Sequence, residues 1–161
     1  MTTESIITLL EWAVPACFGL HIVEEFFWPG GFPTWYQRYR PWVAGTSQSY
    51  YYKANAIYFA GALLVPLASG GPRMVLIWSG ILLCNLIFTH ACGALRTRRY
   101  SPGIVTGCLL YVPLFAASCG YLLGRHVVST QKALICLAIS PIPEIYFALK
   151  RVRITPPAVK G

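Results

Sequence analysis

The sequence contains no aspartate and only five glutamates, and charged residues occupy 11% of its 161 positions. Soluble domains carry about 25% charged residues, so this scarcity excludes an ordinary water-soluble domain. Hydrophobic residues make up 56% of the chain and aromatic residues 14%, and the mean hydropathy is +0.56. This composition indicates an integral membrane protein.

The sequence also lacks the short motifs of nucleotide binding and of common hydrolases. It has no Walker loop, no GxGxxG segment before a helix, no GxSxG elbow and no HExxH pair. Its six cysteines form no CxxC pair and all lie within apolar runs, so we interpret them as small core residues. The net charge of +8 comes from short basic clusters between apolar runs, which argues against a nucleic-acid partner.

Five apolar stretches approach the roughly 17 to 25 residues that an α-helix needs to cross the hydrocarbon core. They cover residues 6–28, 50–69, 74–95, 103–124 and 132–149. The last stretch is the weakest because Pro141 and Pro143 interrupt it. We therefore predict an all-α integral membrane bundle of about five transmembrane helices, with residues 1–161 forming a single transmembrane domain.

The basic residues predict the orientation of this bundle. Arg73, Arg125 and Lys132 fall on one side of the five stretches, and the other ten of the thirteen Lys and Arg residues fall on the opposite side. Cytoplasmic loops carry the excess of Lys and Arg, so the N-terminus is expected outside and the C-terminus in the cytoplasm. We expect a multi-pass protein of the cell inner (plasma) membrane.

The segment between the first two stretches mixes aromatic and basic residues, as is typical of a membrane interface. It contains Trp35, Tyr36, Arg38, Tyr39, Arg40 and Trp42. We interpret it as an interfacial anchor, and a lid over a lateral entrance is the alternative.

Ionisable residues inside the predicted spans are the strongest functional signal in the sequence. Such residues are costly in hydrocarbon, so they usually face the bundle interior and mark a function. They are Glu11, Glu24, Glu25, Glu144, His21 and His90. The spacing of i, i+3 and i+4 places Glu24 and Glu25 one helical turn from His21. Glu11 lies near the outer end of the first span and is interpreted as an interfacial carboxylate.

The alternating direction of the spans gives each polar residue a depth in the bundle. Five spans each contribute one to the same level near the cytoplasmic end, namely His21, Asn55, His90, Thr106 and Glu144. Asn85 lies about a turn deeper, and Tyr111 could line the same cavity. Asn85 and His90 are five residues apart, about 140° around an ideal helix, so both can face one site only if the helix is distorted.

The segment His21-Ile22-Val23-Glu24-Glu25 spells HxxEE at the cytoplasmic end of the first span. With Asn85 and His90 on the third span, and Tyr100-Ser101-Pro102-Gly103 and Thr106 at the start of the fourth, the chain resembles the HXXEE family of small polytopic membrane proteins. The resemblance extends over about residues 8–149. It nominates His21, Glu24, Glu25 and His90 as functional residues and implies no particular activity.

Two kinds of catalysis fit these residues. A set of His21, His90 and Glu24 or Glu25, above all Glu25, would suit Zn²⁺ or non-haem Fe, with Glu144 as a further ligand or partner. Alternatively, the adjacent glutamates and His21 could act without metal as acid and base, in a double-bond isomerisation, a cyclisation or an epoxide opening.

Two readings without catalysis stay open. Intramembrane Glu and His could serve a proton-coupled transporter, hold a cationic substrate or bind a lipid, or they could form a hydrogen-bonded cluster that only joins helices. We favour an enzyme that acts on a lipophilic small molecule or lipid. Its expected catalytic residues are His21, Glu24, Glu25, His90 and Glu144, and its expected substrate-binding residues are Asn55, Asn85, Thr106 and Tyr111.

Overall fold

The computed structural model describes residues 1–27, 31–43, 45–68 and 70–152, and all the regular elements in these ranges are helical. The chain begins with α1 (Thr3–Phe27), passes through the short α2 (Phe32–Tyr39) and a 3₁₀ turn (Pro41–Val43), and continues as α3 (Gln48–Leu67). One continuous helix follows, which consists of α4 (Gly71–Asn85), the π-helical segment η2 (Leu86–Ala91) and α5 (Cys92–Thr97). The next continuous helix contains α6 (Ile104–Thr106), the π-helical segment η3 (Gly107–Tyr111) and α7 (Val112–Gly124), and the last pair is α8 (Thr130–Ile139) and α9 (Ile142–Val152).

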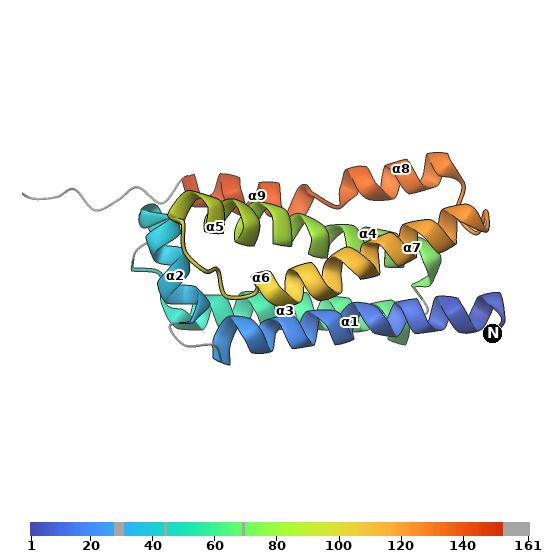
Figure 1. The fold of residues 1–161 in the computed structure, drawn as a ribbon, viewed down its shortest axis with the longest axis horizontal. Helices are drawn as coiled ribbons and strands as arrows, with labels where there is room; N and C mark the ends of the chain where they lie inside the picture. Colours follow the sequence, from blue (N-terminus) through green and yellow to red (C-terminus); the bar gives the residue numbers. More distant parts are fainter. Residues whose placement is uncertain (28–30, 44, 69, 153–161) are drawn as a thin grey trace, which may run out of the picture.

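The long helices lie side by side along one axis, and α2 crosses one end of the bundle (Figure 1). Large apolar side chains such as Leu20 and Leu109 are more than half exposed on the outside, whereas His21, Glu25 and His90 are buried. Apolar groups outside and ionisable groups inside are the arrangement expected of a protein that is surrounded by lipid. The predicted all-helical fold is confirmed, and this arrangement supports a membrane protein.

Three helices among the described residues are long and apolar enough to cross a membrane: Thr3–Phe27, Gly71–Thr97 and Ile104–Gly124. The stretches predicted over 50–69 and 132–149 are helical as α3 and as the α8–α9 pair, but they are not among these three. Five spans and the orientation of the termini therefore stay predictions. Positions 28 and 69, where two predicted spans end, and the basic residues Arg153 and Lys160 lie outside the described residues.

The predicted interruption of the last stretch lies between α8, which ends at Ile139, and α9, which begins at Ile142. Proline removes a backbone N–H donor and clashes with the preceding helical turn, so Pro141 separates the two helices. Ser140 lies at this break, where its hydroxyl donates to the carbonyls of Cys136 and Ile77.

Helix α1 carries two carboxylates that cap other helices at opposite ends of the bundle. Glu11 Oε1 accepts a hydrogen bond from the N–H of Gly71, the first residue of α4, at 2.9 Å. Glu24 accepts N–H bonds at the start of α6. The first N–H groups of a helix have no partner within it, and its N-terminus favours negative charge. Glu11, expected as an interfacial carboxylate near the outer end of the first span, is thus buried as a cap of α4.

The apolar core lies between the long helices, and a separate aromatic cluster forms around α2. This aromatic cluster comprises Phe32, Trp35, Tyr36, Tyr39 and Tyr51, together with the aliphatic Val43. Since these side chains are buried against the end of the bundle, α2 covers the interior, unlike an anchor whose rings lie among lipid headgroups.

Candidate metal-binding site

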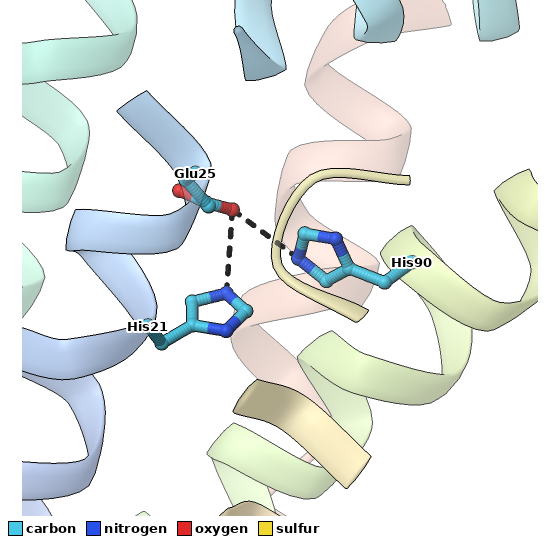
Figure 2. Close-up of side chains that lie close together, drawn as sticks. All are labelled: His21, Glu25 and His90. Carbon is cyan, nitrogen blue, oxygen red and sulfur yellow. Dashed lines mark ion pairs between the residues drawn. The ribbon is translucent and has the colours of Figure 1, made fainter. Parts of the chain in front are cut away.

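Three buried ionisable side chains meet beneath α2. His21 and Glu25 lie one turn apart on α1, and His90 reaches them from η2 (Figure 2). The Nε2 atoms of His21 and His90 lie 3.3 Å and 3.2 Å from the same oxygen, Glu25 Oε1. The exposed fractions of the three residues are 1%, 0% and 3% for His21, His90 and Glu25.

These close contacts do not have hydrogen-bond geometry. Among the described residues, the two Nε2 atoms and Glu25 Oε2 are buried without a hydrogen-bond partner. Leaving a buried polar atom unpaired costs about 1–3 kcal/mol, so three such atoms at one point need an explanation. One ligand atom from each residue lies within 4.8 Å of the others, and the group could hold a metal ion.

The donor atoms and their separations fit a transition-metal ion. Imidazole nitrogen and carboxylate oxygen bind Zn²⁺ at about 2.0–2.2 Å, which puts neighbouring ligands of a tetrahedral ion about 3.3–3.6 Å apart. Glu25 Oε1 lies 3.3 Å and 3.2 Å from the two Nε2 atoms, at the short end of this range, and the three ligand atoms all lie within 4.8 Å of one another. Two histidines and one carboxylate also suit non-haem Fe(II).

A hydroxyl group lies within hydrogen-bond distance of Nδ1 in each imidazole, whereas Nε2 lies near Glu25. Thr106 Oγ1 lies 3.0 Å from Nδ1 of His21, and Ser101 Oγ lies 3.1 Å from Nδ1 of His90. Thr106 donates its one hydroxyl proton to Glu24 Oε2, so its oxygen accepts from the Nδ1–H of His21. Nδ1 therefore carries the ring proton of His21, and the lone pair of Nε2 faces Glu25 and His90. Such an outer contact is typical of metal-bound histidine.

The two glutamates of the HxxEE motif have different surroundings. The Glu24 carboxylate accepts bonds from the N–H groups of Gly103, Val105 and Thr106, at 2.9, 3.2 and 2.6 Å. Tyr100 donates its hydroxyl to the same carboxylate, and partial burial together with the Glu24 charge raises the pKa of Tyr100, which keeps it a donor. Glu24 thus reaches His21 through Thr106, whereas Glu25 contacts both imidazoles directly.

The turn before α6 presses against the imidazoles. Gly103 has a φ of +97°, a conformation that side chains disfavour. A Cβ atom on Gly103 would lie 2.7 Å from Cε1 of both His21 and His90. Only glycine allows the turn to approach this closely, and the approach brings the neighbouring Ser101 to His90.

Aromatic rings cover further sides of the two imidazoles. The ring of Trp35 is stacked parallel to His90 at 6.3 Å between centroids, and Phe32 lies at 5.5 Å. The ring of Tyr111 lies 4.7 Å from that of His21. Interactions between charges are stronger in such a dry environment than in water.

A cavity of about 90 Å³ opens on the Glu25 side of the cluster. The expected site residues Asn55, Asn85 and Glu144 line this cavity. Thr106 and Tyr111 were expected to bind substrate, but they contact the imidazole of His21 and are not among the lining residues.

The π-helical segment η2 provides the distortion that the spacing of Asn85 and His90 requires. Because i→i+5 hydrogen bonds place more residues in each turn, five residues come closer to a full turn than they do in an α-helix. Asn85 accordingly lines the cavity that Glu25 borders, while His90 contacts Glu25. Both π-helical segments, η2 and η3, contribute residues to the site, and such segments often occur at functional sites.

The contacts of three further residues of the site could not be predicted from the sequence. Ser101 and Gly103 belong to the stretch that carries the family resemblance, but their contacts with the histidines depend on the turn before α6. Thr89, which donates to Glu144 at 3.3 Å, carries no signal in the sequence beyond its position next to His90.

The fold and site together define an all-helical protein with three helices long and apolar enough to cross a membrane, and with a buried cluster of two histidines and a glutamate. The chain belongs to the family described as "protein of unknown function with HXXEE motif", whose model matches residues 12–118. This match confirms the family predicted from the motif. Neither the comparison with curated proteins nor that with solved structures found a match.

Proposed function

We propose that this chain is a metal-dependent membrane enzyme that acts on a lipophilic small molecule or lipid. One Zn²⁺ or Fe²⁺ ion would be held by Nε2 of His21, Nε2 of His90 and the carboxylate of Glu25. The observation that carries the proposal is the convergence of these three buried donors without hydrogen-bond geometry. An ion held by two histidines and one carboxylate keeps open positions, where it supplies a Lewis acid for a substrate oxygen or for water.

The surrounding residues have separate tasks in this proposal. Thr106 and Ser101 orient the imidazoles through their Nδ1 atoms. Glu24 is assigned a positioning role, in place of the catalytic role expected from the sequence, because its carboxylate is already bonded to the start of α6. Phe32 and Trp35 exclude water, and the cavity beside Glu25 receives the substrate.

The proposed setting is the inner (plasma) membrane, with five membrane-crossing segments and the site near the cytoplasmic side. Exposed apolar side chains on α3 and α8, such as Ile57 and Leu134, support lipid contact for the two segments that length and composition alone do not identify. The excess of basic residues on the loops at the α2 end of the bundle supports a cytoplasmic position for this end. A substrate that enters from the bilayer would then reach the cavity without crossing water.

The metal content of the purified protein tests the proposal. Tag-free protein in detergent is compared with the variants His21→Ala, His90→Ala and Glu25→Gln by elemental mass spectrometry. We expect about one zinc or iron per wild-type chain and a loss of most of it in each variant, because a site with two ligands binds far more weakly.

Two matched variants control for general effects of the substitutions. His126→Asn changes the third histidine, which has a left-handed φ of 55° that asparagine tolerates, and Glu4→Gln changes an exposed carboxylate. Both controls should keep the full metal content. Absence of metal from protein prepared without chelators would contradict the proposal, and Glu25 between two imidazoles would then be tested as a proton-transfer group.

A further inference from the structure

We infer that the cavity beside Glu25 binds a protonated amine and that Glu144 is its counter-ion. This inference rests on the proposed function, because it assigns the substrate class of the same site. The substrate would be a lipophilic amine whose ammonium group lies at Glu144 and whose neighbouring atoms face Glu25.

The Glu144 carboxylate is fixed at the cavity wall by two neutral donors. Its Oε1 atom accepts a bond from Asn85 Nδ2 at 3.1 Å, and its Oε2 atom accepts one from Thr89 Oγ1 at 3.3 Å. Among the lysines and arginines whose side chains the structure describes, none lies within ion-pair distance of it. A carboxylate inside a membrane bundle is costly without a compensating positive charge, so this position favours a cationic ligand.

The rest of the cavity wall suits a cation as well. Six of the lining residues are aromatic: Phe18, Phe32, Tyr36, Tyr50, Tyr51 and Tyr58. The faces of aromatic rings attract ammonium groups, and the attraction is stronger where water is excluded. None of the lining residues is a lysine or an arginine, whereas two of them, Glu25 and Glu144, are carboxylates.

The charges of the two carboxylates, Glu25 and Glu144, are compensated in different ways. In the proposed function the charge of a divalent ion would be balanced by Glu25 and by one further anionic ligand at an open position, so Glu144 is left to be compensated by a cationic ligand. Glu25 Oε2 is buried without a hydrogen-bond partner, and Glu25 borders the same cavity, so a molecule held at Glu144 lies next to the site. One water needs about 10–15 Å³ of such space, so 90 Å³ admits an ammonium head and its first methylene groups.

Calorimetric titration of the purified chain tests this inference. Zinc-loaded protein in phosphatidylcholine nanodiscs is titrated at neutral pH with hexylamine, which is then an ammonium ion, and with hexan-1-ol, which has the same chain without the charge. We expect hexylamine to bind at least 10-fold more tightly than hexan-1-ol. Equal affinities, or no binding of the amine, would overturn the inference, and this comparison needs no variant.

The variant Glu144→Gln adds a second measurement, with Glu4→Gln as the matched control. Glu144→Gln should keep its zinc and lose at least 10-fold in hexylamine affinity, while the control keeps both. If Glu144→Gln retains the amine affinity, or loses zinc and amine together, Glu144 is only a contact between α9 and η2, and the inference is wrong. If wild-type protein binds the amine selectively but never zinc, the proposed metal function fails while the amine site stands.

Discussion

The contact between Thr106 and His21 allows a quantitative test of the proposed metal site. The substitution Thr106→Val keeps the shape of the side chain and removes the hydroxyl that accepts from Nδ1 of His21. The N–H of residue 106 still bonds to Glu24, and Glu24 keeps its bonds from Gly103 and Tyr100. Glu24 loses only the bond from the Thr106 hydroxyl, so the start of α6 should stay in place while the imidazole of His21 loses its acceptor.

The expected magnitude follows from the burial of His21, which is 1% exposed. A buried N–H group that loses its acceptor costs about 1–3 kcal/mol. Removing such an outer contact of a metal-bound histidine lowers metal affinity by about 10–100-fold, which corresponds to about 1.4–2.8 kcal/mol. The two values agree, so we expect the zinc dissociation constant of Thr106→Val to rise by about 10–100-fold.

Competition with a chromophoric zinc chelator measures this dissociation constant in detergent. Thr97→Val is the matched control, because the Thr97 hydroxyl only donates to the carbonyl of Gly93 within α5. A zinc affinity of Thr106→Val within about 2-fold of wild type, with unchanged thermal unfolding, would refute the assignment of His21 as a ligand whose Nδ1 is held by Thr106.

Three further substitutions separate the site from the scaffold. Ser101→Ala removes the hydroxyl contact with His90 and should also lower zinc affinity by about 10–100-fold in the chelator competition. Gly103→Ala should lower the thermal stability by about 1–3 kcal/mol and reduce the zinc content, because its Cβ would overlap both imidazoles. Glu11→Ala uncaps α4 at the other end of the bundle and should cost about 0.5–2 kcal/mol of stability, seen as a lower unfolding temperature, with a full zinc content.

The helical fold and the three central residues of the site, His21, Glu25 and His90, could be predicted from local patterns. Apolar runs of span length identify helices, and the spacing of four between His21 and Glu25 places them on one helix face. His90 was assigned to the same level because consecutive spans reverse direction, and the structure brings it to Glu25. These features depend only on helical geometry, which a single sequence contains.

The different roles of Glu24 and Glu25 could not be predicted from the sequence. Adjacent helical residues point about 100° apart, so the elements that lie next to each side chain decide its role. The start of α6 lies beside Glu24, and η2 lies beside Glu25. Sequence periodicity does not specify which helix faces which side. The same limit explains why the sequence does not reveal that Glu11 caps α4.

Irregular backbone accounts for the other differences. The spacing of Asn85 and His90 argued against a shared site, and the π-helical segment η2 changes their relative direction. The aromatic segment of α2 matched the composition of an interfacial anchor, which does not differ from that of a cover such as Phe32 and Trp35 form over His90. In both cases tertiary packing decides between conformations that the sequence permits.

X-ray absorption spectroscopy of the metal-loaded protein tests the central claim most directly, because it identifies the atoms around the ion. The proposed site predicts nitrogen and oxygen ligands at about 2.0–2.2 Å, with the outer-shell scattering of two imidazoles, and His90→Ala should bind too little metal to give this spectrum. The chain also has six cysteines, whose sulfur atoms are the alternative ligands for such an ion. Sulfur at about 2.3 Å, or scattering from fewer than two imidazoles, would contradict a site made of His21, Glu25 and His90.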